Sequence, residues 1–202
     1  MTFRSFAIVP AAGRSERMGN PKLRLPWGGS TIIETVLVAW RAGGVEQIVV
    51  TVHPDDGELA ELCRRSGAEV VVPTVPPPDM KASVLAGLQY VTARHAPVAA
   101  DAWLMAPADL PLLSAEIIAH LLQEHPFEPN RILVPVLGGR RGHPVLFPWA
   151  WAERAASLPE NVGLNALLRS EDVREVAFAS AISDDDVDMP EDYGRLKNRY
   201  SR

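Results

Sequence analysis

The chain has 202 residues, of which 47% are apolar and 22% are charged, and its formal net charge is −5. This length suits one α/β domain with a sizeable core. The acidic balance argues against binding to nucleic acid or to an anionic membrane, because both require a basic surface. No apolar run is long enough to cross a bilayer and no secretory segment follows Met1, so we expect a cytoplasmic protein. The single Cys63 lies on the apolar side of a predicted helix, which favours a buried side chain over a nucleophile.

A strand followed by a cationic loop opens the chain. Residues 6–9 form an apolar run that predicts a buried strand. The loop that follows carries Gly13, Gly19, Arg14, Arg17, Lys22 and the hydroxyl of Ser15. Glycine lets a ligand come close to the backbone, and N–H groups and cations together bind anions, so the loop predicts a polyphosphate site. The glycine spacing fits neither the dinucleotide fingerprint nor the P-loop.

The next elements alternate between helix and strand. Residues 31–34, T-I-I-E, form a capping box that opens a predicted helix ending near residue 41. Apolar runs at 47–52 and 69–73 predict strands, and a helix is expected over 58–65. The order β-α-β-α-β predicts a mostly parallel sheet with helices on its faces. We therefore expect a Rossmann-like, three-layer α/β/α fold, with residues 1–202 forming a single domain.

The middle of the chain places a carboxylate at the end of a strand. After a proline-rich stretch, a helix is predicted over 80–94; Ser83 lies in its first turn, and Lys81 is expected to be solvated rather than a phosphate contact. A strand beginning at residue 102 runs into a turn that carries Asp109. Ligands of open α/β sheets bind outside the carboxyl ends of the strands, and a carboxylate there can hold Mg²⁺. The alternative is that Asp109 only braces the turn.

A second cationic glycine-rich loop follows a helix over 115–125 and a strand over 131–136. This loop contains Arg140, Arg141, Gly142 and His143, and it returns into a strand. Either arginine could grip an acceptor phosphate, whereas His143 could bind the acceptor or shape the turn. Helices over 149–156 and 163–169, a strand over 173–177 and a final helix over 190–198 complete the prediction. An acidic run at 184–192 leads into that last helix.

Residues 11–22, which read A-A-G-R-S-E-R-M-G-N-P-K, resemble the signature of the MobA-like nucleotidyltransferases. Four further segments resemble other motifs of that family: 80–88, 108–111, 139–147 and 186–192. Asp79 and Ala108 stand where the family usually has glycine, and Met189 stands where it has threonine. The resemblance extends from residue 7 to residue 193 and implies a fold of the nucleotide-diphospho-sugar transferase type.

The resemblance implies a role for each matching residue. The nucleotide would be bound by Ala11, Ala12, Gly13, Arg14, Ser15, Arg17, Lys22 and Ser83. Arg17, Lys22 and Asp109 would be catalytic, and Mg²⁺ would be held by Asp109 and Asp188, with Asp186 as the alternative to Asp188. The acceptor would lie against Arg140, Arg141, Gly142 and His143. Residues 159–163 match a loop that closes on the acceptor in relatives.

The substrates follow from the same resemblance. Ala12, together with the G-H-P segment at 142–144, is most similar to the cytidylyl-transferring molybdenum-cofactor branch of the family. That branch implies CTP, a phosphorylated acceptor such as molybdopterin, release of pyrophosphate, and transient contact with a molybdoenzyme or its chaperone. Sugar-1-phosphate, isoprenoid-precursor and phospholactate acceptors remain alternatives within the fold. A nucleotide-binding regulatory module without catalytic activity is an alternative of a different class. An NAD-dependent oxidoreductase is disfavoured because the dinucleotide fingerprint is missing.

Overall fold

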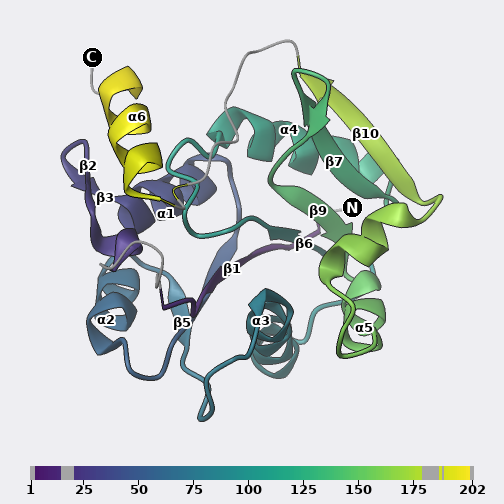
Figure 1. Ribbon diagram of the computed structural model, residues 1–202. Coiled ribbons are helices and arrows are strands. Elements are labelled where there is room, and N and C mark those ends of the chain that lie inside the picture. Colours follow the sequence, from purple (N-terminus) through teal and green to yellow (C-terminus); the bar gives the residue numbers. More distant parts are fainter. Residues whose placement is uncertain (1–2, 15–20, 179–186, 188, 201–202) are drawn as a thin grey trace.

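A mixed sheet forms the centre of the molecule (Figure 1). The computed structural model describes the chain except residues 1–2, 15–20, 179–186, 188 and 201–202. The strands of the sheet are β1 (Ser5–Ala11), β4 (Gln47–Val52), β5 (Glu69–Val71), β6 (Ala102–Met105), β7 (Ile132–Leu137), β8 (Arg140–Arg141), β9 (Val145–Pro148) and β10 (Val173–Phe178). Their order is β10-β7-β9-β6-β1-β4-β5, and β8 pairs with β7. Strands β5, β4, β1 and β6 are parallel, whereas β9 is antiparallel to both neighbours.

Helices cover both faces of this sheet. They are α1 (Ile32–Ala42), α2 (Gly57–Arg65), α3 (Met80–His95), α4 (Ala115–Glu124), α5 (Trp151–Ala156) and α6 (Pro190–Tyr200). Three short 3-10 helices, η2 (Lys22–Arg24), η3 (His125–Phe127) and η4 (Leu164–Arg169), and a hairpin of β2 (Pro26–Trp27) and β3 (Ser30–Thr31) complete the described elements. Strand β1 shows the layering: Ala7 and Val9 pack with α1, α2 and α4, whereas Phe6 and Ile8 pack with α3, α5 and η4. The expected three-layer α/β/α fold is confirmed.

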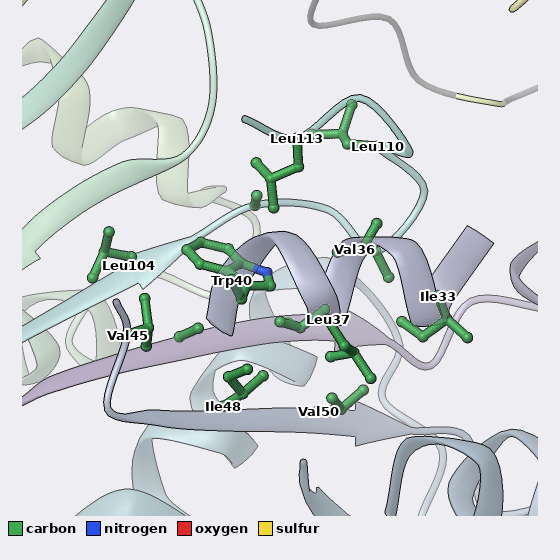
Figure 2. Close-up of a cluster of buried hydrophobic side chains, with 14 of the residues drawn as sticks. Ile33, Val36, Leu37, Trp40, Val45, Ile48, Val50, Leu104, Leu110 and Leu113 are labelled. Carbon is green, nitrogen blue, oxygen red and sulfur yellow. The ribbon is translucent and has the colours of Figure 1, made fainter. Parts of the chain in front are cut away.

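Helix α1 illustrates how the sequence produces this packing. The Glu34 N–H donates to the Thr31 hydroxyl, and the Glu34 carboxylate accepts from the Thr31 N–H at 3.0 Å, which completes the predicted capping box. The apolar stripe that follows faces the sheet, and Figure 2 shows Leu37 and Trp40 beside Ile48. Burial of this stripe, more than helix propensity, holds a helix of this length in place.

Two local features differ from the sequence prediction, and a third stretch forms elements that were not predicted. The loop at 137–143 is in part a β-hairpin, because Gly138 and Gly139 have φ values of 55° and 80° and turn β7 directly into β8. Such positive angles are what a two-residue hairpin turn requires, so these glycines serve the turn. The predicted helix at 163–169 is the 3-10 helix η4. Between residues 22 and 31, for which no element was predicted, the chain forms η2 and the small β2–β3 hairpin.

The part of the chain that the structure describes contains no helix with both the length and the apolar character needed to span a membrane. Cys63 is fully buried, and burial raises the pKa of its thiol to about 12. The thiolate is the nucleophilic form of cysteine, so the prediction of a structural Cys63 is supported by its surroundings.

A partly buried ion pair lies at the amino-terminal edge of the sheet. The Asp101 carboxylate, whose side chain is 3% exposed, accepts from the Arg4 guanidinium and from the N–H groups of Arg4 and Val98, each at 2.8 Å. Burial raises the pKa of Asp101, but these hydrogen bonds and the Arg4 charge outweigh burial and hold the pKa below its usual value. Asp101 therefore stabilises the fold in its ionised form.

Replacing Asp101 by Asn is expected to lower the free energy of unfolding at pH 7 by about 2 kcal/mol, because the buried carboxylate loses the charge that strengthens its hydrogen bonds from Arg4 and Val98. A carboxyl group whose pKa is lower in the folded state contributes stability above its unfolded pKa, and that contribution is lost as the pH falls toward the folded pKa. Urea unfolding at pH 7 and pH 3 should therefore show a smaller difference between wild type and variant at pH 3. An equal difference at both pH values would contradict the assigned role.

Candidate active site

A pocket of about 560 Å³ opens at the carboxyl ends of β1, β4 and β6. The chain runs from β1 outward to β4 and β5, then returns to place β6 on the other side of β1. The pocket therefore lies at the topological switch point of the sheet, where ligands of open α/β folds bind. It is lined by Pro10, Ala11, Ala12, Gly13, Arg14, Lys22, Leu23, His53, Pro76, Pro77, Pro78, Asp79, Met80, Ser83, Pro107, Ala108 and Asp109.

All six described residues of the predicted nucleotide site meet in this pocket. They are Ala11, Ala12, Gly13, Arg14, Lys22 and Ser83. The described part of the protein holds nothing within 4 Å of the position that a Cβ on Gly13 would take. Open space beside this residue is what the backbone of an anion-binding loop requires. Ser15 and Arg17 lie outside the described residues, as do Asp186 and Asp188.

An ion pair joins two segments of the pocket that are far apart in sequence. Lys22 Nζ, in the first turn of η2, lies 2.5 Å from Asp109 Oδ2, just beyond β6. Both side chains are largely buried, with exposed fractions of 17% and 14%. The other carboxylate oxygen, Asp109 Oδ1, is buried and has no hydrogen-bond partner among the described residues. A buried oxygen without a partner is costly, so this atom is suited to a ligand that accepts its lone pairs.

A segment near the carboxyl terminus of the chain contacts the backbone of Asp109. The Val187 N–H donates to the Asp109 carbonyl oxygen at 3.1 Å, and the Val187 side chain is fully buried. Among the described residues there is no group of three or more His, Cys, Asp or Glu side chains that could hold a metal ion. Mg²⁺ binds proteins through one or two carboxylates together with substrate phosphates, so Asp109 Oδ1 fits a hard cation without such a cluster.

His53 is a pocket residue that the sequence prediction missed. It directly follows β4, its residue is only 6% exposed, and it lines the pocket. Arg14 Nε lies 3.1 Å from His53 Nε2, and Arg14 also pairs with the Asp55 carboxylate at 2.9 Å. The Asp55 N–H faces His53 Nδ1 at 3.1 Å. The available signal was position, since a polar residue directly after a parallel strand lies at the ligand-binding edge.

The start of α3 forms another wall of the pocket. The Asp79 carboxylate accepts from the Ala82 N–H at 2.7 Å and caps the helix, and the Ser83 hydroxyl donates to the Asp79 carbonyl at 3.1 Å. The expectation of a solvated Lys81 is wrong. Lys81 is only 8% exposed, and its ammonium group donates to backbone carbonyls instead of facing solvent.

The four residues predicted to face the acceptor lie apart from the pocket lining. Arg140 and Arg141 form β8 and are exposed, while the Gly142 N–H donates to the Pro135 carbonyl at 2.8 Å. His143 is half-buried and precedes β9, whose first residue pairs with Met105 at the end of β6. Gly142 and His143 therefore reach the same edge of the sheet as Asp109.

Comparison with known proteins places this geometry in a family. Over 134 residues the chain is 30% identical to a probable molybdenum cofactor guanylyltransferase of Bacillus cereus (strain ATCC 10987 / NRS 248), a match that covers 66% of this chain and 62% of that protein. It is also 26% identical over 198 residues to the molybdenum cofactor cytidylyltransferase of Escherichia coli (strain K12), covering 96% of each. The first match thus spans less than two thirds of that relative's length.

Solved structures share the whole fold. The crystal structure of Rv0371c from Mycobacterium tuberculosis H37Rv is 28% identical, with a TM-score of 0.80 and coverage of 98% of this chain and 99% of that one. The same protein has been solved in complex with manganese, at 25% identity and a TM-score of 0.71, covering 96% and 98%. The sequence also matches the MobA-like NTP transferase domain over residues 7–176, from the first strand of the sheet into the last. This chain belongs to the family of MobA-like NTP transferase domains.

Proposed function

We propose that this chain is a Mg²⁺-dependent nucleotidyltransferase that transfers CMP from CTP to the phosphate of molybdopterin and releases pyrophosphate. The observation that carries the proposal is the buried Lys22–Asp109 pair, in a pocket at the switch point of the sheet. A cation and a carboxylate in contact provide one group for a phosphate and one for a metal. The family membership supports the same reaction class.

The nucleotide side of the proposed site is the pocket itself. The backbone at Ala11, Ala12 and Gly13 would receive the phosphates, with Arg14 and Lys22 offsetting their charge. Ser83 would contact the nucleotide from the start of α3. Ser15 and Arg17 belong to the same proposed loop on the strength of the sequence motif. Fixed donors and cations of this kind stabilise charge that develops during transfer without having to reorganise.

The proposed metal ligands are Asp109 and Asp188. Asp109 Oδ1 supports this role because it is buried without a partner among the described residues. Val187, the chain neighbour of Asp188, bonds to the Asp109 backbone, which supports the second ligand. A divalent ion bound there would supply charge neutralisation at the phosphate oxygens. The manganese complex of the structural relative supports a divalent cation as the cofactor.

The acceptor needs no general base. A phosphate monoester has a second pKa near 6, so the acceptor is mostly a dianion at pH 7 and can attack the α-phosphorus directly. One bond forms between the acceptor oxygen and the α-phosphorus, while the bond from the α-phosphorus to the bridging oxygen breaks and pyrophosphate leaves. The residues then act by alignment and charge stabilisation. Arg140, Arg141, Gly142 and His143 are proposed to lie on the acceptor side of the site. This part of the proposal is based on the sequence motif.

The choice of CTP rests on Ala12 and on the relative that aligns over almost the whole of both chains, a cytidylyltransferase. GTP is the competing nucleotide, because the relatives at 30% identity are guanylyltransferases. Reaction in the cytoplasm and transfer of the product to a molybdoenzyme or its chaperone are parts of the same proposal.

The proposal is tested by following pyrophosphate release from CTP, GTP, ATP and UTP with Mg²⁺ and molybdopterin. We expect release to require both Mg²⁺ and the acceptor and to be fastest with CTP. Faster release with GTP would overturn the nucleotide assignment, and release only with a sugar phosphate or another acceptor would overturn molybdopterin. Tight NTP binding with no release for any acceptor would favour a regulatory module.

A further inference from the structure

Two cations outside the pocket lining hold the same stretch of backbone. We define residues 159–169, the loop after α5 together with η4, as the bridging segment. Lys81 binds its beginning and Arg141 binds its end. Each cation belongs to a motif that the sequence associated with substrates, yet the described bonds of Lys81, and one bond of Arg141, go to backbone carbonyls of this segment.

Lys81 is fully engaged at the first end. Its Nζ lies 2.7 Å from the Pro159 oxygen, 2.8 Å from the Glu160 oxygen and 2.9 Å from the Val162 oxygen. An ammonium group has three N–H donors, so these three carbonyls satisfy all of them. Charge-assisted hydrogen bonds are stronger than neutral ones, and the residue is almost entirely buried. Lys81 is therefore not available to a phosphate in this arrangement.

Arg141 holds the second end. Its guanidinium donates to the Leu168 carbonyl at 2.9 Å and to the Glu175 carboxylate on β10 at 2.7 Å. Between the two ends, Leu164 and Leu167 are buried in the same apolar cluster as Val84 of α3. The bridging segment is thus fixed by polar contacts at its ends and by apolar packing in its middle.

The segment connects the two sides of the proposed site. Lys81 lies in the first turn of α3, between Met80 and Ser83, which line the pocket. Arg141 lies two residues before His143, which enters β9 at the sheet edge occupied by Asp109. A displacement of the bridging segment would therefore change the distance between the start of α3, which lines the pocket, and residues 140–143.

We propose that Lys81 is a positioning residue that fixes the bridging segment and so holds the acceptor side of the site at the correct distance from the bound nucleotide. This inference rests on the proposed nucleotidyl transfer. Lys81 acts through the backbone of the segment and touches neither substrate. Its loss disturbs alignment with the acceptor more than nucleotide binding.

The kinetic test compares Lys81→Met with wild type in the full chain, using molybdopterin and CTP. We expect the KM for molybdopterin to rise roughly 10- to 100-fold, as for misplacement remote from the reacting atoms, with the KM for CTP within about twofold. Arg94→Met is the matched control, because Arg94 is an exposed cation in the last turn of the same helix. It should leave both constants unchanged. Equal rises in both constants for Lys81→Met would overturn the proposal.

Hydrogen exchange gives a second readout that does not depend on turnover. In Lys81→Met, amides of the bridging segment should exchange faster, while those of α1 and β4 remain as protected as in wild type. Unchanged exchange in the bridging segment would show that Lys81 does not fix this segment, whatever the acceptor is. If Lys81→Met does not fold, Pro159→Gly tests the same point. It loosens the exposed start of the segment and keeps the carbonyl, and it should produce the same KM split to a smaller extent.

If wild type transfers nothing to molybdopterin, the proposed acceptor is wrong, and the exchange experiment alone decides whether Lys81 holds the segment. If transfer occurs and the KM split is absent, the proposed function stands and the positioning role is wrong. The two failures are therefore distinguishable.

Discussion

Replacing Asp109 by Asn is expected to lower kcat/KM for nucleotidyl transfer by about 10³-fold, the size of effect found when one preorganised charge-stabilising group is removed from an active site. The side chain keeps its shape but loses its negative charge, and an NH2 group replaces one of the two oxygens, so it can no longer both accept from Lys22 through one oxygen and bind a metal through the other. The initial rate of pyrophosphate release at saturating Mg²⁺ and molybdopterin, with the CTP concentration varied, measures kcat/KM. Retention of more than a tenth of wild-type activity would contradict the role of Asp109.

The control for this variant is Asp55→Asn. Asp55 is also a carboxylate near the pocket, but its side chain is 76% exposed and its partner is Arg14 at the rim. An exposed ion pair contributes little interaction free energy, so its loss should change kcat/KM less than about tenfold. A loss equal to that of Asp109→Asn would show that charge near the pocket, rather than a specific ligand, limits the reaction.

Replacing Lys22 by Met is expected to lower kcat/KM by about 10²- to 10³-fold, because a cation that offsets phosphate charge is lost. The same change should strengthen binding of Mn²⁺ alone. In wild type the ammonium group of Lys22 lies against the carboxylate that the metal would use, and a cation there opposes a second cation. Titration of Mn²⁺ by electron paramagnetic resonance, without nucleotide, measures this effect.

The matched control for the Lys22 variant is Arg24→Gln. Arg24 belongs to the same 3-10 helix, but it pairs with Asp56 and Glu58 and does not line the pocket. Neither turnover nor Mn²⁺ affinity should change by more than about twofold, because these contacts of Arg24 lie outside the pocket lining. Weaker Mn²⁺ binding in Lys22→Met than in wild type would contradict the idea that Lys22 and the metal compete for Asp109.

The fold could be predicted because its elements carry strong local signals. Apolar runs such as residues 47–52, and a capping box at Thr31 and Glu34, produce the expected strand and helix within one or two residues. The hairpin at 137–141 was missed because its glycine pair sits among arginines, which suggested a ligand loop. Helix η4 shares an apolar cluster with α3, a long-range contact that periodicity does not reveal, and its apolar spacing alone does not separate a 3-10 helix from an α-helix.

The candidate site was predictable where a motif combined with strand topology. Asp109 and Lys22 are 87 residues apart in sequence, and their contact follows from β1 and β6 being parallel neighbours. His53 was missed because no motif marks it. Lys81 was misjudged because its partners are backbone carbonyls from a distant loop, and the residue types around it contain no sign of them.

Binding of a metal–nucleotide complex between Lys22 and Asp109 is tested most directly by the thermal stability of the protein with CTP, with and without Mg²⁺. A ligand that binds only the folded state at about 100-fold its Kd stabilises by roughly 2.7 kcal/mol, which raises the melting temperature by several degrees. We expect a Mg²⁺-dependent rise of the melting temperature in wild type that is lost in Asp109→Asn and in Lys22→Met. An equal rise in wild type and both variants, or no rise with any NTP, would contradict binding of a metal–nucleotide complex between Lys22 and Asp109.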